Sequence, residues 1–310
     1  MKFVIHCILL LSVSGFALAA KAQTVAVNQP AQWDMPGTPV IDEALLSRNF
    51  LQPFNPADAR FAPAAVLQGM VLPLQFARDI GYGLYVDEPF VNDKPVIVLV
   101  HGMNDSPLRF QPLLKKLNRE RYQVARFYYP TAMKIAANGE VLGRMLERVM
   151  QRAPETRFVI VAHSLGGLVS RSAIEYLQTQ NKAAAVTDFF SIASPWGGHE
   201  LAKLAVSRSP LIMPVWRDLA DDGEFLQQMY ARPLPKTLRF HLLYASAGGL
   251  KAFGEPNDGV LTVRCQLDER ARRAAHQVIE IKAAHIPALQ HADTANSINA
   301  ALLAVALVDE

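Results

Sequence analysis

The chain has 310 residues, of which 51% are hydrophobic, and this is enough apolar material for one large domain. Its 31 basic and 28 acidic residues nearly balance, so it lacks the basic surface that nucleic-acid binding requires. It contains no H-E-x-x-H, no paired C-x-x-C and no Walker-type glycine loop. We therefore expect no bound metal, no cofactor and no nucleic-acid partner.

Residues 1–22 form the first recognisable segment, in which Lys2 precedes an apolar run that ends in small residues up to Ala22. This order predicts a secretory signal peptide that is cut after Ala22, or after Ala19. An uncleaved membrane anchor is the alternative, because about 18 apolar residues are near the minimum for a span. Cleavage leaves Cys265 as the one cysteine of the mature chain. We therefore expect an exported protein, periplasmic or secreted, without an internal disulfide.

Residues 23–81 come next, and most of them lack the pattern of a helix or strand. Residues 23–61 are rich in proline, are broken by asparagine and glycine, and show no sustained hydrophobic period. We expect residues 23–81 to form an N-terminal arm, with some extended pieces, packed on the domain that residues 82–310 build.

Within that domain, short apolar runs alternate with amphipathic segments. The predicted strands are residues 95–100, 122–129, 157–162, 187–193, 238–245 and 276–281, and the predicted helices are residues 107–121, 140–152 and 165–177. Such alternation predicts a mostly parallel, doubly wound α/β sheet with helices on both faces. Active sites of these sheets gather at the carboxyl ends of the strands. The loops at those ends therefore carry the candidate chemistry.

The stretch VIVAHSLGGL, residues 159–168, places Ser164 on the turn between a predicted strand and a predicted helix. In a nucleophile elbow the serine backbone is strained, and the residues two before and two after it must be small. Ala162 and Gly166 occupy those places. The pattern predicts a nucleophilic serine, and the alternative is an ordinary turn between strand and helix.

A hydrolytic serine needs backbone amides that bind the oxyanion of the attacked carbonyl. One amide normally comes from the residue after the serine, which is Leu165, and the other from an earlier strand-end loop. The loop after the strand at residues 95–100 supplies Met103 as that second donor. Gly102 allows close approach, and we expect His101 to brace the loop rather than to transfer protons.

The candidate acid is Asp258, which lies in the turn-forming sequence Asn257-Asp258-Gly259-Val260 after a predicted strand. A carboxylate in this place can orient a catalytic histidine. Asn-Asp-Gly also forms turns for conformational reasons alone. We expect Asp258, rather than Glu255 or Asp268, to be the acid.

The candidate base is His285, which lies in the loop after the last predicted strand and shortly before Pro287. A histidine on a loop can reach over the serine. His276 and His291 fit surface or packing roles better. The order Ser164, Asp258, His285 is the order of nucleophile, acid and base expected for this type of sheet.

Taken together, the motifs HGM, AHSLGG, NDGV and AAH resemble those of the α/β-hydrolase family, in particular its lipase and esterase-like members. The stretches SPWGGHELA and WRDLADDGEFLQQM are also similar to secreted bacterial lipases and to lipase-like deacylases of lipid anchors. The resemblance covers about two thirds of the chain. It implies that Ser164 is the nucleophile, His285 the base and Asp258 the acid. Ala162 departs from the usual glycine.

The segment from about residue 196 to 236 is an insertion rich in apolar side chains, among them Trp196, Met213 and Trp216. Long insertions often act as lids, and a lid here would cover the serine and could line a site for acyl chains. The alternative is a helical subdomain that is packed shut by its own tryptophans.

These observations predict a serine ester hydrolase that works through an acyl-enzyme on a small-molecule or lipid ester. An acyltransferase with the same three residues is one alternative. A catalytically silent lipid or ligand-binding protein on a hydrolase scaffold is another. A lid could also bring the protein into peripheral contact with a membrane or lipid interface.

Overall fold

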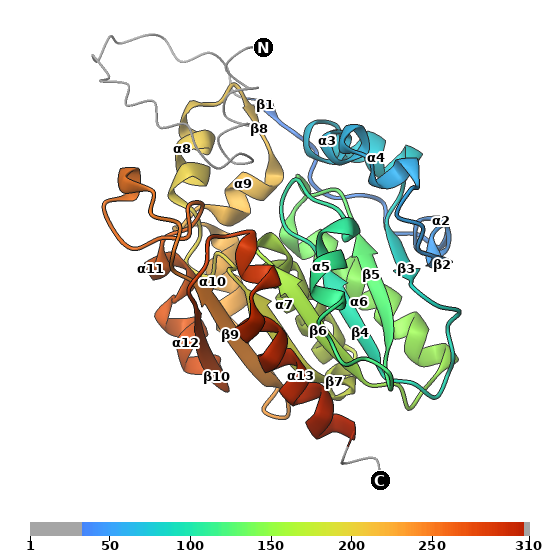
Figure 1. The fold of residues 1–310 in the computed structure, drawn as a ribbon. Coiled ribbons are helices and arrows are strands. Elements are labelled where there is room, and N and C mark those ends of the chain that lie inside the picture. Colours follow the sequence, from blue (N-terminus) through green and yellow to red (C-terminus); the bar gives the residue numbers. More distant parts are fainter. Residues whose placement is uncertain (1–32, 307–310) are drawn as a thin grey trace, which may run out of the picture.

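An eight-stranded sheet forms the centre of the molecule in a computed structural model that describes residues 33–306 (Figure 1). From edge to edge its strands are β10 (Gln277–Ile281), β9 (Arg239–Ala245), β7 (Val186–Ile192), β6 (Phe158–His163), β4 (Val96–Val100), β5 (Gln123–Tyr128), β3 (Gly83–Val86) and β2 (Phe50–Pro53). The six strands from β10 to β5 are parallel, and β3 is antiparallel to β5. The predicted mostly parallel sheet is confirmed.

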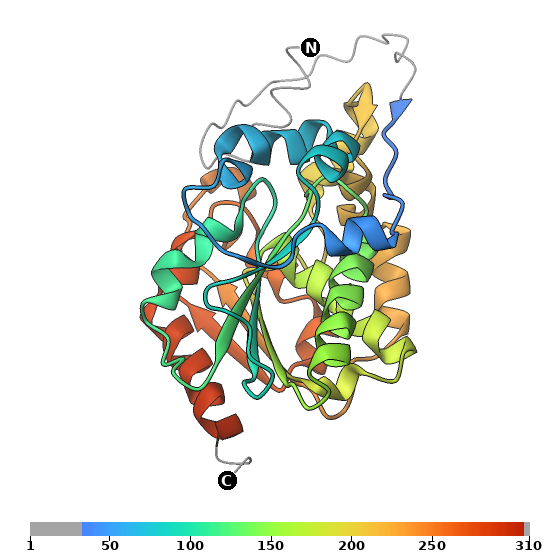
Figure 2. The same ribbon diagram turned by 90° about the vertical axis from the view of Figure 1, so that its right-hand side faces the viewer.

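Helices cover both faces of the sheet, as Figure 2 shows with the sheet seen nearly edge-on. The helices α6 (Ile135–Arg152) and α7 (Leu165–Thr179) lie on one face, and α5 (Gln111–Leu114) and α13 (Ala292–Ala306) lie on the other. Alternate residues of β4 serve the two layers: Val98 packs in the core cluster with α6 and α7, whereas Leu99 packs in the cluster with α5 and α13. A strand buried on both faces must be apolar throughout, which explains the unbroken run at residues 95–100.

Two helices differ in length from the prediction, and tertiary contacts explain both differences. The predicted helix at residues 107–121 consists of η2 (Pro107–Phe110) and α5, because Asn299 of α13 binds the amide of Asn118 at 2.8 Å and the carbonyl of Lys116 at 3.0 Å. The helix α6 begins before the predicted residue 140. Its first amide, that of Ile135, donates to the buried carboxylate of Asp218 at 2.7 Å.

The described part of the N-terminal arm is largely helical and also extends the sheet. It contains α2 (Glu43–Ser47), η1 (Ala59–Phe61), α3 (Pro63–Val71), α4 (Pro73–Asp79) and the edge strand β2. Pro63 and Pro73 begin their helices, where a missing N–H costs nothing. Phe61 and Phe76 are buried against Tyr128. The predicted signal peptide, residues 1–22, lies outside the described residues.

The insertion folds into α8 (Glu200–Arg208), β8 (Leu211–Ile212), α9 (Pro214–Leu219) and α10 (Glu224–Ala231). The short strand β1 (Trp33–Asp34) of the arm pairs with β8, and Arg217 binds the carboxylate of Asp34 with two hydrogen bonds of 2.8 and 3.0 Å. Trp196, Met213 and Trp216 are at most 1% exposed and belong to the main core cluster. These three side chains, which were candidates for lining an acyl site, are therefore part of the core.

The remaining helical elements are the turns η3 (Ala183–Ala185), η4 (Lys251–Phe253) and η5 (Pro287–Gln290) and the short helices α11 (Val263–Gln266) and α12 (Glu269–Ala274). The turn η5 begins at Pro287, and the last helix, α13, begins five residues later. Within residues 33–306, no helix combines the length and the apolar content that crossing a bilayer would require.

Candidate active site

The turn between β6 and α7 holds Ser164 in a strained backbone conformation, with φ 55° and ψ −127°. Such values are costly for a non-glycine residue and persist only where the surrounding structure enforces them. The surroundings here are tight. A Cβ at Gly166 would lie 2.3 Å from the carbonyl oxygen of Val100, and one at Gly102 would lie 2.9 Å from the Cβ of Ser164. The small residues around Ser164 are therefore a steric requirement of this turn.

A cavity of about 150 Å³ opens at Ser164, at the carboxyl ends of the strands. Ser164, Asp258, His285 and Met103 all line it, although they come from four separate loops. Leu165 is the first residue of α7, and the first amides of a helix have no acceptor within that helix. The structure thus brings the predicted residues together, with Leu165 directly beside the serine.

The carboxylate of Asp258 binds the ring of His285, with 2.6 Å between Oδ2 and Nδ1. Its Oδ1 accepts the amides of Val260 at 2.8 Å and Leu261 at 2.7 Å, and Gln266 donates to Oδ2 at 3.2 Å. Asp258 is 1% exposed, so every one of these donors replaces lost water. The arrangement holds the carboxylate firmly and directs it at His285. Nothing in the sequence pointed to Gln266, whose role depends on the fold.

The other candidate carboxylates are engaged elsewhere. Glu255 pairs with Arg264 at 3.3 Å, and Asp268 pairs with Arg270 at 2.9 Å.

The other candidate histidines also have different surroundings. His276 is exposed, and His291 lies 3.4 Å from the carboxylate of Asp293. Neither histidine lines the cavity at Ser164.

The loop that carries Met103 is held by contacts of His101 and of Asn104. The ring of His101 is fully buried, stacks on Tyr129 and donates from Nδ1 to the carbonyl of Gly102 at 2.9 Å. Burial lowers the pKa of His101 to about 4, so the ring is neutral in neutral solution. The amide of Asn104 donates to the hydroxyl of Thr131 at 3.1 Å. The bracing role expected for His101 agrees with these contacts.

His163, directly before the serine, also contributes to the site, although no sequence motif indicated a role for it. Its Nε2 lies 3.0 Å from the carbonyl oxygen of His285. Because a carbonyl can only accept, Nε2 must carry the proton. Burial, followed by the nearby ring of His285, lowers the pKa of His163 to about 3, so the ring remains a neutral donor. His163 therefore holds the backbone of the loop that presents His285.

One ion pair lies in the cavity wall. Arg109 donates to Asp105 with 2.5 Å between Nε and Oδ2, and both residues line the cavity. Across residues 33–306, no three His, Cys, Asp or Glu side chains gather in a way that could hold a metal ion.

Comparison with known families locates the similarity in the part of the chain that contains the elbow. Residues 92–219 match the family described as "Putative serine esterase (DUF676)". No curated protein matches the sequence of this chain.

Solved structures resemble the chain over most of its length. The mature form of the Bacillus licheniformis lipase BlEst2 has a TM-score of 0.55 and 20% identity, over 71% of this chain and 97% of that one. The propeptide form of the same lipase has a TM-score of 0.52 and 19% identity, over 72% of this chain and 52% of that one. At such identities the similarity concerns the fold, and it confirms the α/β-hydrolase architecture.

Proposed function

Because residues 92–219 match a serine esterase family on an α/β-hydrolase fold, we infer that the protein is an ester-hydrolysing enzyme, and we propose that Ser164 is its nucleophile. The observation that carries this proposal is the pairing of Asp258 with His285 at 2.6 Å in the cavity that Ser164 also lines. A nucleophile, a base and an orienting acid in one cavity are the requirements of serine hydrolysis.

In the proposed mechanism the hydroxyl oxygen of Ser164 attacks the ester carbonyl while Nε2 of His285 takes its proton. The amides of Met103 and Leu165 stabilise the oxyanion of the tetrahedral intermediate. His285 then gives the proton to the leaving alcohol, and Asp258 stabilises the imidazolium between these transfers. Water, activated by His285, hydrolyses the acyl-enzyme and returns Ser164 to its free form.

A fluorophosphonate probe tests the nucleophile directly, because it bonds covalently to an activated serine. We expect mass mapping of the labelled protein to find the probe on Ser164. Absence of labelling, together with absence of ester hydrolysis, would instead favour a catalytically silent binding protein on this scaffold. Product analysis in the presence of added alcohols separates hydrolysis from acyl transfer, since a transferase makes a new ester instead of the free acid.

The substrate class follows from the walls of the cavity. The apolar side chains Trp196, Met213 and Trp216 are buried in the core and do not line the cavity at Ser164, which is small and contains the Asp105–Arg109 pair. We propose that the enzyme prefers esters with short acyl chains. An apolar acyl pocket would add up to about 0.8 kcal/mol per methylene, or roughly fourfold in efficiency. A nitrophenyl ester series from acetate to decanoate should lack that rise; a steady rise would contradict the proposal.

We further propose that the protein is exported, on the strength of the signal-like composition of residues 1–22. Amino-terminal sequencing of the protein recovered from each cell fraction provides the test. Export predicts a chain that starts at Gln23 in the periplasm or the medium, whereas an intact terminus in the membrane fraction would indicate an uncleaved anchor.

A further inference from the structure

Arg109 has no part in the mechanism described above, although it borders the reacting groups. Among the described residues that line the cavity at Ser164, it alone carries a permanent positive charge. It belongs to η2, the turn that follows the loop of Met103, and 33% of its side-chain surface is exposed. Pockets for small molecules use a few such polar groups to orient the ligand.

The carboxylate of Asp105 fixes one edge of the Arg109 guanidinium. Its Oδ2 accepts Nε of Arg109 at 2.5 Å, and its Oδ1 accepts the amide of Ser106 at 2.8 Å. Within residues 33–306, the guanidinium makes its hydrogen bond and ion pair through Nε, so the two terminal nitrogens keep their N–H groups for another acceptor. These two nitrogens form a fork that matches the oxygens of a carboxylate or phosphate.

The charge of Arg109 acts on residues beside the proposed nucleophile. Burial is the main cause of the lowered pKa of His163, and Arg109 is a smaller cause in the same direction. Burial likewise lowers the pKa of His101, and Arg109 again adds to the shift. His163 directly precedes Ser164, and His101 begins the loop of Met103. The guanidinium charge is therefore close to the place where an ester would react.

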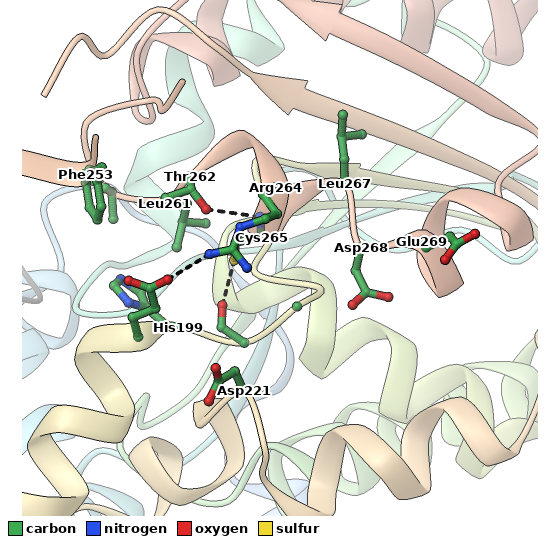
Figure 3. Close-up of a pocket in the computed structure, with 14 residues that line it drawn as sticks. His199, Asp221, Phe253, Leu261, Thr262, Arg264, Cys265, Leu267, Asp268 and Glu269 are labelled. Carbon is green, nitrogen blue, oxygen red and sulfur yellow. Dashed lines mark hydrogen bonds and ion pairs between the residues drawn. The ribbon is translucent and has the colours of Figure 1, made fainter. Parts of the chain in front are cut away.

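A second cavity, of about 310 Å³, contains an arginine in different surroundings (Figure 3). This cavity shares Val260 with the first, and Arg264 lines it. The guanidinium of Arg264 binds the carboxylates of Glu200 at 2.9 Å and Glu255 at 3.3 Å. Two carboxylates thus already engage Arg264, whereas in the described part of the chain Arg109 pairs with one. Arg109 is the arginine with donors left for a ligand.

We propose that Arg109 is a specificity-determining residue that binds an anionic oxygen group, a carboxylate or a phosphate, on the ester substrate. The proposal rests on the function proposed for Ser164, Asp258 and His285, and it narrows the substrate class of that site. The cavity of about 150 Å³ is small. The anion must therefore lie within a few bonds of the ester that is cleaved.

Matched pairs of small esters test the proposal in a pH-stat assay. Monoethyl succinate has a carboxylate on the acyl side, and ethyl succinamate replaces it by an uncharged amide of similar shape. Acetylglycolate and acetylglycolamide form the same pair on the alcohol side, and acetylated glycerol phosphate and acetylated glycerol test a phosphate. We expect kcat/KM to be about tenfold higher for the anion in at least one pair, because hydrogen bonds to charged groups are the stronger ones. The pair that responds identifies the anion and its side of the ester.

Substitutions of the two arginines connect this preference to Arg109. Arg109→Gln removes the charge and should bring the ratio of the two kcat/KM values to about one. Arg109→Lys keeps the charge without the fork and should retain part of the preference. The matched control is Arg264→Gln, which should retain the full ratio. The ratio is the readout because a general loss of folded enzyme would lower both rates equally.

Two outcomes would overturn the proposal. One is equal efficiency on both members of every pair, and the other is a preference that survives in Arg109→Gln. An enzyme that hydrolyses the neutral esters without a charge preference would keep the proposed function and lose this inference alone. Failure of the proposed function has a different signature, because Ser164 would stay unlabelled by the fluorophosphonate and no ester of either kind would be hydrolysed.

Discussion

Two buried aspartate–histidine pairs lie within residues 33–306, and one of them borders the cavity at Ser164. Asp258 and His285 lie 2.6 Å apart in loops at the carboxyl ends of β9 and β10, next to the cavity at Ser164. Asp188 and His241 lie 2.9 Å apart within β7 and β9. Both carboxylates are at most 1% exposed. The difference between the pairs therefore does not come from burial.

The surroundings of the two carboxylates differ. Asp188 faces Arg239 across the sheet and accepts two hydrogen bonds from its guanidinium, at 2.8 and 2.7 Å. Burial works against its charge, but the hydrogen bonds from His241 and Arg239 outweigh burial and lower the pKa of Asp188. The ring of His241 stacks on Phe190 with 4.2 Å between centroids. This pair holds two strands together, and its carboxylate charge is already balanced.

Asp258 accepts hydrogen bonds from the neutral amides of Val260 and Leu261 and from Gln266, and within residues 33–306 its ion-pair contact is with His285. An aspartate–histidine pair thus becomes useful for proton transfer when the donors around the carboxylate are uncharged and the histidine borders a cavity with a nucleophile. The following substitutions test this comparison, from the largest expected effect to the smallest.

Removal of the nucleophile should leave the Asp258–His285 pair without catalytic use, like the pair at Asp188. We expect Ser164→Ala to lower kcat by about six orders of magnitude, as in other serine hydrolases that lose this group. Fluorophosphonate labelling should disappear, while circular dichroism and thermal unfolding stay close to the original. Substantial ester hydrolysis by the variant would refute the assignment of the nucleophile.

Substitution by asparagine should affect activity at Asp258 and stability at Asp188. Asp258→Asn should lower kcat by up to about four orders of magnitude, because the histidine loses its orienting charge. Asp188→Asn should leave kcat nearly unchanged and lower the free energy of unfolding by about 2 kcal/mol, since Arg239 loses a charged acceptor. Kinetics and urea unfolding measure the two effects. Glu255→Gln is the control, and a collapse of activity in that variant alone would identify a different acid.

His285 also differs from His241 in that its backbone carbonyl is held by another histidine, His163. His163→Ala removes the donor to the carbonyl of His285, so we expect kcat to fall by about tenfold. His163→Gln can restore an N–H donor and should recover part of the activity. Steady-state kinetics of both variants are the measurement. Full activity in His163→Ala would show that the loop of His285 does not need this support.

Asp218 is a third buried carboxylate, and it pairs with the amide of Ile135 instead of a histidine. Burial raises its pKa from 3.8 to about 6, against the opposing effects of the amide and Lys134. Between about pH 4 and 6 the folded state therefore keeps Asp218 protonated, whereas the unfolded state releases this proton. The free energy of unfolding thus falls as pH rises through this interval.

Asp218→Asn removes this titration while retaining an acceptor for the amide of Ile135. Relative to the original protein, the variant should gain stability between pH 4 and 6 and reach a benefit of up to about 3 kcal/mol above pH 6. Urea unfolding at pH 4, 5, 6 and 7 measures this difference. A difference that is constant across these pH values would contradict the raised pKa.

The sequence alone was sufficient for the features that depend on short-range patterns. Apolar runs predict the parallel strands because a strand buried on both faces needs an unbroken run, as in β4. The elbow was predictable because close packing at Gly166 leaves no room for a larger side chain. The order of Ser164, Asp258 and His285 also indicated one site, and the structure brings these residues to one cavity.

Tertiary contacts decided the rest, since they join residues that are far apart in the sequence. The arm contributes β2 because β3 offers it a free edge, and α6 begins at Ile135 because Asp218 caps it from another helix. The sequence left open whether Trp196, Met213 and Trp216 line a site or belong to the core, and tertiary packing places these three side chains in the core. The support at His163 was likewise hidden, because a hydrogen bond to a distant carbonyl leaves no pattern in the local sequence.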